Sequence, residues 1–147
     1  MSKFLIIEDD KIKIEKLSLF FEKQDFEVRE SYYAGLNELL SNSQHYNLLI
    51  LDMSIPLWDR GNVDLGGNFE QFGGVNILRE MKRKKKMIPT IILTMFDVFA
   101  DGKLTFDQLN SDLLNQFPDF YYGAIFYNAS EDKWKTELQY LIQTIKL

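Results

Sequence analysis

Three short, continuous apolar runs constrain the fold of this chain more than any other feature of its sequence. They are Phe4 to Ile7, Leu48 to Leu51 and Thr90 to Leu93. An apolar run without alternation is typical of a strand that is buried on both faces of a parallel sheet. Two further segments, Phe26 to Val28 and Tyr121 to Tyr127, also have the composition of strands. The sequence therefore predicts five strands.

Helical patterns lie between and after these predicted strands. Apolar side chains repeat at helical spacing around Leu17, Leu36, Leu78, Leu113 and Leu138. Ser31 and Ser130 precede the second and the last of these segments and are the expected N-caps. Strands that alternate with helices predict a doubly wound α/β fold, in which a parallel sheet lies between two layers of helices.

Length and composition narrow the class of protein. The 147 residues fit one domain, expected to span residues 1–147 with long loops at about 57–72 and 96–103. The absence of cysteine excludes disulfides and thiolate metal sites. The net charge of −5 makes nucleic acid an unlikely partner. No apolar stretch approaches the ~20 residues of a membrane-spanning helix, so we expect a cytoplasmic protein with no membrane partner.

Acidic side chains and one hydroxyl stand where the predicted strands end. Glu8, Asp9 and Asp10 follow the first strand, Asp52 follows the third, and Thr94 ends the fourth. The carboxyl ends of parallel strands share one edge of a sheet, which is where doubly wound proteins bind ligands. An isolated acidic triplet would be read as solvated loop residues. Carboxylates from two strand ends, however, repel one another unless a cation such as Mg²⁺ compensates, so a cation-binding pocket is predicted.

Four segments of the chain resemble, in order, the motifs of response-regulator receiver domains (CheY-like). Phe4–Asp10 resembles the first strand of receivers with its acidic turn, and Leu48–Pro56 resembles their phosphorylation-site strand with its proline. Ile88–Thr94 resembles the switch strand, and Gly123–Tyr127 resembles the fifth strand. Each motif alone is weak, but the ordered set is specific and spans nearly the whole chain. The resemblance implies a flavodoxin-like fold with the strand order 2-1-3-4-5.

The resemblance also implies a phosphorelay reaction that uses Mg²⁺ as cofactor. In receivers an aspartate takes a phosphoryl group from a histidine kinase, a phosphotransfer protein or a small acyl phosphate. Carried over by position, Asp52 is the phosphoacceptor and also a metal ligand. Asp9 is a direct metal ligand, Glu8 acts through a coordinated water, and the backbone carbonyl of Ser54 is a further ligand. Phosphoryl transfer needs mainly positioning and charge neutralisation, which such a site supplies.

Two further residues match the switch positions of the family. Thr94 would hydrogen-bond a phosphoryl oxygen, and Tyr127 would then rotate inward. The implied output is a changed affinity for a downstream protein target, with a homodimer as a further possibility. A receiver of this kind is a signalling phosphoacceptor and not an enzyme in the usual sense.

One family residue is missing. Receivers carry a lysine near the end of the fifth strand that pairs with the phosphoryl group, and Ser130 stands at that position here. Lys133 is close in sequence, but the last helix should carry it away from the site. Three hypotheses follow: a stand-alone phosphoacceptor receiver, a degenerate receiver that binds partners through its fourth and fifth helices without phosphorylation, and a Mg²⁺-dependent enzyme acting on a small phosphorylated substrate.

Other motifs are better explained by structure than by function. Asp97 to Gln108 resembles part of a calcium-binding loop, but Phe99 stands at its third position and Gln108 at the position of the bidentate glutamate. Thr105 and Gln108 instead fit a capping box. The basic run Lys82 to Lys86 complements the end of a helix. His45 is expected to be an exposed loop residue.

Overall fold

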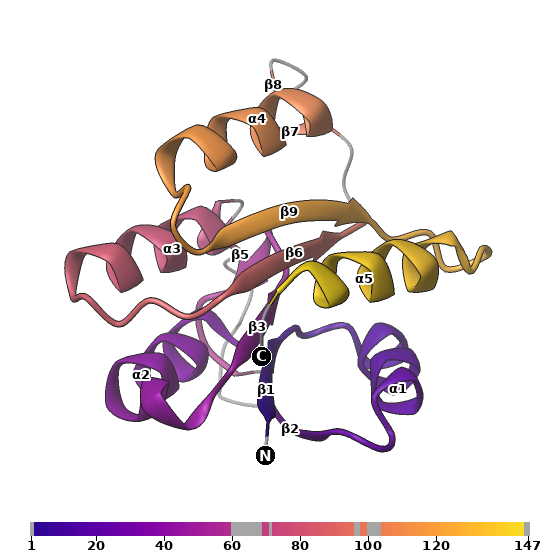
Figure 1. Ribbon diagram of the computed structural model, residues 1–147, viewed down its shortest axis with the longest axis horizontal. Coiled ribbons are helices and arrows are strands. Elements are labelled where there is room, and N and C mark those ends of the chain that lie inside the picture. Colours follow the sequence, from indigo (N-terminus) through magenta and orange to yellow (C-terminus); the bar gives the residue numbers. More distant parts are fainter. Residues whose placement is uncertain (1, 60–68, 71, 96–97, 100–103, 146–147) are drawn as a thin grey trace.

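A five-stranded parallel sheet forms the centre of the molecule. The computed structural model describes residues 2–59, 69–70, 72–95, 98–99 and 104–145 (Figure 1). The strand order is β2-β1-β3-β6-β9, with the bounds β1 Lys3–Ile7, β2 Asp25–Arg29, β3 Leu48–Leu51, β6 Thr90–Thr94 and β9 Tyr121–Phe126. All four pairings are parallel. The predicted doubly wound fold and its order 2-1-3-4-5 are therefore confirmed.

Helices cover both faces of this sheet, as Figure 1 shows. One face packs against α1 and α5, and the other against α2, α3 and α4. The bounds are α1 Lys11–Phe20, α2 Tyr32–Asn42, α3 Gly73–Arg83, α4 Phe106–Gln116 and α5 Lys133–Thr144, with the short 3₁₀ helix η1 Ser43–His45 after α2. The three-layer arrangement follows from the alternation of strands and helices along the chain.

The two helical layers explain why the apolar runs are continuous. In β1, Phe4 and Ile6 belong to the core under α1 and α5, whereas Leu5 and Ile7 belong to the core under α2, α3 and α4. Successive side chains of a strand point to opposite faces, so a sheet that is covered on both sides requires apolar residues at every position. All four of these side chains are buried.

Two of the three predicted helix caps are present. The Ser31 hydroxyl accepts a hydrogen bond from the backbone N–H of Ala34 at 3.2 Å, and Thr105 forms the predicted capping box with Gln108. The prediction of Ser130 as a cap is wrong, because α5 begins at Lys133 after Asp132. The hydroxyl and the backbone N–H of Ser130 both donate to Asn128 Oδ1, at 2.9 and 3.0 Å, which holds Ser130 in a turn before the helix.

Two short antiparallel strand pairs each join a strand within a predicted loop to a strand just outside it. The pair β4–β5 joins Ile55–Pro56 to Phe69–Glu70, and the pair β7–β8 joins Val98–Phe99 to Leu104–Thr105. Residues 60–68, 71, 96–97 and 100–103 of the predicted loops, and with them part of the segment that resembles a calcium loop, lie outside the described residues. Two-residue strands cannot be predicted from a local pattern, because their pairing depends on distant segments.

Candidate functional site

Three carboxylates meet at the carboxyl edge of the sheet. The strand register pairs Ile7 with Leu51, so the residues that follow β1 and β3 lie side by side. Glu8, Asp9 and Asp52 each offer a carboxylate oxygen, and these oxygens lie within 4.8 Å of one another. The three residues are between 1% and 6% exposed. The predicted convergence of Glu8, Asp9 and Asp52 is thus present in the structure, and we refer to these three residues as the carboxylate cluster.

Backbone hydrogen bonds hold two members of the carboxylate cluster in place. The Asp52 backbone N–H donates to the Ile7 carbonyl at 3.1 Å, and Asp52 Oδ1 accepts from the Met53 N–H at 2.7 Å. Glu8 Oε2 accepts from the N–H groups of Asp9 and Asp10, both at 3.1 Å. Backbone N–H groups thus hold Asp52 Oδ1 and Glu8 Oε2, which fixes the orientation of both carboxylates. The second oxygen of each, Asp52 Oδ2 and Glu8 Oε1, faces Lys13.

Asp10 has a different role from the rest of the acidic turn. Its side chain caps α1 by accepting hydrogen bonds from the N–H groups of Ile12 and Lys13, at 3.0 and 3.3 Å. This cap determines where α1 begins. It therefore also determines which residues of the first helical turn face the sheet.

Lys13 is the functional residue that the sequence analysis missed. It is 1% exposed, and its ammonium lies 2.5 Å from Glu8 Oε1 and 2.5 Å from the Leu93 carbonyl oxygen. The same nitrogen lies 3.7 Å from Asp52 Oδ2, which is within ion-pair range but too long for a strong hydrogen bond. A buried ammonium therefore joins two carboxylates of the cluster to β6.

A weak signal for Lys13 existed in the sequence. Lys13 and Leu17 are the buried residues of α1 and stand one helical turn apart, so a lysine occupies a core-facing position. Apolar residues nearby hid this pattern, since Ile12 and Leu19 are 64% and 65% exposed. Counting Ile14 with Leu17 and Phe21 as the apolar stripe placed Lys13 beside the buried face, whereas Ile14 is only half-buried.

The buried charges of this site act on one another across short distances, since the Lys13 ammonium lies 2.5 Å from Glu8 Oε1 and 3.7 Å from Asp52 Oδ2. Burial raises the pKa of Glu8 to about 8, although the ammonium of Lys13 opposes the rise. Burial lowers the pKa of Lys13, but the carboxylates of Asp52 and Glu8 more than compensate, so that the pKa is raised overall. The oxygen donors of the carboxylate cluster lie close enough together to hold one metal ion, and carboxylate oxygens suit a hard divalent ion.

Thr94 and Tyr127 lie next to each other at the ends of neighbouring strands. Thr94 is the last residue of β6 and is fully buried, and its carbonyl accepts a hydrogen bond from the Tyr127 N–H at 2.8 Å. The Tyr127 ring is 2% exposed, with its centroid 5.4 Å from the Lys13 ammonium and 5.3 Å from the Trp134 ring. Tyr127 thus lies inside the molecule, between Lys13 of α1 and Trp134 of α5.

Three other residues singled out from the sequence lie around the carboxylate cluster or away from it. Ser54 is half-buried in the turn after Asp52, and its carbonyl remains a predicted ligand. Ser130 is exposed and bonded to Asn128, and Lys133 is exposed at the first residue of α5. Within the described part of the chain, Glu8 and Asp52 form their ion pairs with Lys13 and not with Lys133, in line with the expectation that the last helix carries Lys133 away from the site.

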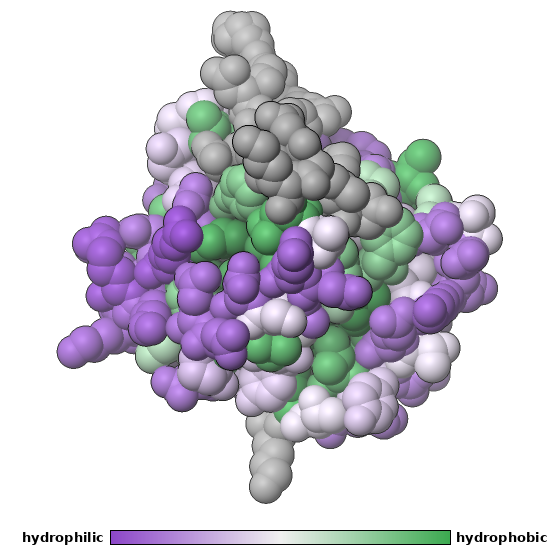
Figure 2. Space-filling view, turned by 90° about the horizontal axis from the view of Figure 1, so that it is seen from above, coloured by the Kyte–Doolittle hydropathy of each residue, from purple (hydrophilic) through white to green (hydrophobic). Residues whose placement is uncertain are grey.

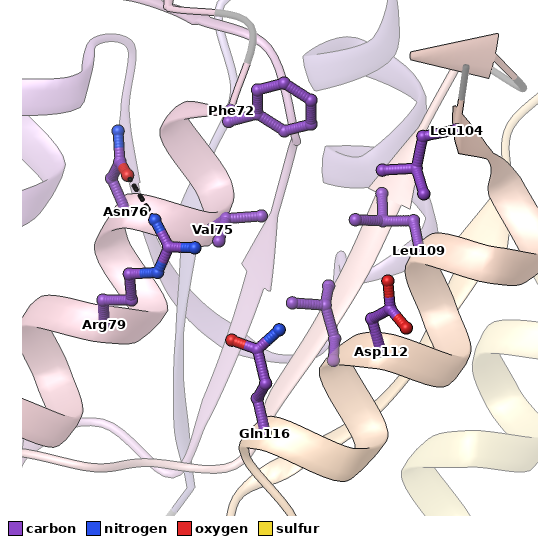
Figure 3. A pocket seen from close by; sticks show the side chains of 9 residues that line it. Phe72, Val75, Asn76, Arg79, Leu104, Leu109, Asp112 and Gln116 are labelled. Carbon is purple, nitrogen blue, oxygen red and sulfur yellow. Dashed lines mark hydrogen bonds between the residues drawn. The ribbon is translucent and has the colours of Figure 1, made fainter. Parts of the chain in front are cut away.

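A groove between α3 and α4 is separate from the carboxylate cluster (Figure 3). It has a volume of about 400 Å³ and is lined by side chains of both helices and the segments before them, among them Phe72, Val75, Arg79, Leu109 and Asp112. No residue of the carboxylate cluster lines it.

Within the described residues, no helix is both long enough and apolar enough to cross a membrane.

Comparison with known proteins finds two similar chains of nearly the same length. An uncharacterised protein of Sinorhizobium fredii is 27% identical over 145 residues, which is 93% of this chain and 94% of that protein. The Detocs response regulatory protein DtcB of Enterobacter cloacae is 21% identical over 141 residues, 91% of this chain and 94% of that protein. A scan against protein-family models finds no match.

Solved structures that resemble this chain include a receiver domain of a response regulator, and the second of these relatives is also named as a response regulatory protein. The receiver domain of a Francisella response regulator aligns over 99% of this chain and 100% of its own, with a TM-score of 0.63 and 19% identity. The chain has the fold of a response-regulator receiver domain. Within the same fold, the CheX–CheY complex with BeF₃⁻ and Mg²⁺ from Borrelia burgdorferi contains a chain that aligns over 98% of this one and 88% of its own. Its TM-score is 0.68 and its identity 13%.

Proposed function

We propose that this protein is a response-regulator receiver that accepts a phosphoryl group on Asp52 in the presence of Mg²⁺. One observation supports this proposal more than any other. Asp52 lies at the edge of a receiver-fold sheet, 3% exposed, with carboxylate oxygens of Glu8 and Asp9 within 4.8 Å and a buried ammonium at 3.7 Å. A carboxylate placed between an acidic pair and a cation is suited to phosphoryl transfer, which depends on positioning and charge neutralisation.

In the proposed reaction, a carboxylate oxygen of Asp52 attacks the phosphorus of an acyl phosphate or a phosphohistidine. A new P–O bond forms to Asp52. The bond to the donor breaks, and its electron pair leaves with the acetate or the imidazole. The carboxylates of Glu8, Asp9 and Asp52 and the carbonyl of Ser54 would hold Mg²⁺, with Glu8 acting through a water. The bound ion would offset the negative charge of the phosphoryl oxygens.

Thr94 and Tyr127 are the proposed link from the phosphoryl group to a partner. The Thr94 hydroxyl would donate a hydrogen bond to a phosphoryl oxygen at the end of β6. The backbone bond from Tyr127 to the Thr94 carbonyl supports a coupled movement of the two residues. Proposed partners are a histidine kinase or phosphotransfer protein as donor and a downstream protein as target, with a homodimer as a further possibility.

The decisive experiment is incubation with Mg²⁺ and acetyl phosphate, followed by intact-mass measurement. The wild type should gain one acid-labile phosphoryl group, and Asp52→Asn should gain none. Asp119→Asn, which changes an exposed aspartate in the turn before β9, is the matched control and should be phosphorylated normally. Beryllofluoride binding can be followed by tryptophan fluorescence, because Trp58 is 63% exposed and Trp134 packs against Tyr127.

A second candidate function is a receiver-like module that binds partners without phosphorylation. One observation favours it: Ser130 stands where the family has lysine. Figure 2 looks onto the α4 side of the molecule and shows apolar side chains gathered between hydrophilic margins. Mg²⁺ binding with no phosphoryl adduct and no response to beryllofluoride would favour this function over the first.

A further inference from the structure

We infer that Lys13 of α1 binds the phosphoryl group of phosphorylated Asp52 and so supplies the positive charge that Ser130 cannot. This inference rests on the proposed phosphoacceptor function and deepens it by assigning a residue to the phosphoryl oxygens. The observation behind it is the position of the Lys13 ammonium, which lies 3.7 Å from Asp52 Oδ2 and is 1% exposed. A second observation is that Ser130 is exposed, in a turn held by Asn128.

Burial of an ammonium at this place needs a physical reason. Burying a charge is costly unless it is paired and hydrogen-bonded, and a methionine or leucine would fill the same core position at no such cost. Lys13 meets the requirement through Glu8 and the Leu93 carbonyl, both at 2.5 Å. The side chain is 1% exposed, so the ammonium lies beside Asp52 and not in solvent.

The hydrogen bonds of Lys13 leave room for a phosphoryl ligand. An ammonium has three N–H donors, and within the described part of the chain two of them are used by Glu8 and Leu93. Asp52 Oδ2 is too far away for a strong hydrogen bond to the third. A phosphoryl group on Asp52 extends beyond the carboxylate and brings oxygens with about two negative charges to this side of the pocket. The geometry therefore assigns the third donor to a phosphoryl oxygen.

The same position connects Lys13 to the proposed switch residues. Its ammonium contacts the carbonyl of Leu93, which directly precedes Thr94, and lies 5.4 Å from the centre of the Tyr127 ring. A movement of the ammonium toward the phosphoryl group would change both contacts. Lys13 therefore provides a route from the phosphoryl group to β6 and Tyr127 from the α1 side of the sheet.

The test compares Lys13→Met with Lys11→Met at saturating Mg²⁺. Lys11 belongs to the same helix turn, and its ammonium is exposed beside Glu30, so this variant controls for the loss of one positive charge. Lys13→Met should weaken beryllofluoride binding and slow adduct formation from acetyl phosphate by at least ~10-fold, equivalent to about 1.4 kcal/mol. Its affinity for Mg²⁺ alone should increase, because a positive charge has left the pocket. Lys11→Met should match the wild type in all three measurements.

Opposite effects on the two ligands separate phosphoryl binding from a structural role. Equal beryllofluoride affinity in Lys13→Met and wild type would overturn the role of Lys13 alone. A parallel loss of Mg²⁺ and beryllofluoride affinity would also overturn it, since removing a positive charge from an intact pocket should strengthen Mg²⁺ binding. A wild type that takes no adduct would overturn the proposed function and this role together.

A measurement on the wild type removes any dependence on the variant's folding. In protein labelled with ¹⁵N at the lysine ammonium groups, the Lys13 signal should shift when beryllofluoride is added in the presence of Mg²⁺. The Lys11 signal should stay in place. An unchanged Lys13 signal in a protein that binds beryllofluoride would refute the assignment.

Discussion

Replacing Gly74 with alanine should displace the backbone that carries Asp52, the proposed phosphoacceptor. Gly74 is the second residue of α3, and a Cβ added there would lie 2.7 Å from the Asp52 carbonyl oxygen and 3.1 Å from Met53 Cα. Both contacts are with backbone atoms, which cannot move aside as a flexible side chain can. The Gly74 N–H also donates to the Met53 carbonyl at 2.9 Å, so α3 and the end of β3 are held together at this point.

The size of the effect follows from two opposing terms. Relieving the contact requires a backbone shift of about half an ångström, and overpacking of this kind costs about 1–3 kcal/mol. Alanine in place of glycine in a helix returns up to ~1 kcal/mol through its higher helix propensity. We therefore expect a net loss of about 1–2 kcal/mol, which for a chain of this size lowers the melting temperature by roughly 3–8 °C.

The assay must distinguish a displaced phosphoacceptor from a merely weaker fold. Val75→Ala is the matched control, because Val75 is the next residue, is 5% exposed and loses a similar free energy of unfolding when truncated. Thermal unfolding should show comparable losses in the two variants. Beryllofluoride affinity should fall in Gly74→Ala and stay at the wild-type value in Val75→Ala. Wild-type stability and affinity in Gly74→Ala would refute the reasoning.

Three further outcomes are expected. A hydrogen bond from the Tyr46 hydroxyl lowers the pKa of Glu38 in the folded protein. The bond therefore stabilises the fold fully at pH values above ~4.3, the pKa of Glu38 in the unfolded chain, and this stabilisation is lost as the pH falls through the lower pKa of the folded protein. Tyr46→Phe should cost about 1 kcal/mol at pH 7 and less at pH 3, measured by urea unfolding; an equal loss at both would contradict this. Thr105→Ala should cost about 1 kcal/mol by removing the acceptor for the Gln108 N–H, whereas Ser111→Ala on the exposed face of α4 should cost little. Mg²⁺ at 100 times its dissociation constant should add about 2.7 kcal/mol to the wild type, and no change in melting temperature would count against the cation site.

The α3–α4 groove in Figure 3 illustrates why a large cavity need not mark the chemistry of a protein. The groove is lined by both apolar and polar side chains. None of the three carboxylates of the cluster is among them. Doubly wound folds bind ligands where the strands end at the switch in strand order, which here is between β1 and β3. The carboxylate cluster lies at that point.

Local sequence patterns were sufficient for the five strands of the parallel sheet, for the five α-helices and for the meeting of the carboxylates. Leu48 to Leu51 could be recognised as a buried strand because every residue in it is apolar, and Ser31 as a cap because its side chain acts on the adjacent turn. The convergence of Glu8 and Asp52 followed from the topology, since parallel strands in register end side by side. Such features depend on interactions within one element or on the order of the elements.

The place of Lys13 was decided only by the tertiary structure. Its burial depends on how α1 is rotated against the sheet, and that rotation leaves Ile12 exposed and brings a lysine to a carbonyl of β6, 80 residues away in sequence. The start of α5 at Lys133 likewise depends on a turn that holds Ser130. The apolar residues Leu17 and Phe21 are buried on the same side as Lys13, and the carboxylates of Glu8 and Asp52 pair with the buried ammonium. Two of the three groups that hold the Lys13 ammonium, Asp52 and Leu93, are 39 and 80 residues away in sequence, so a local pattern along the chain does not contain them.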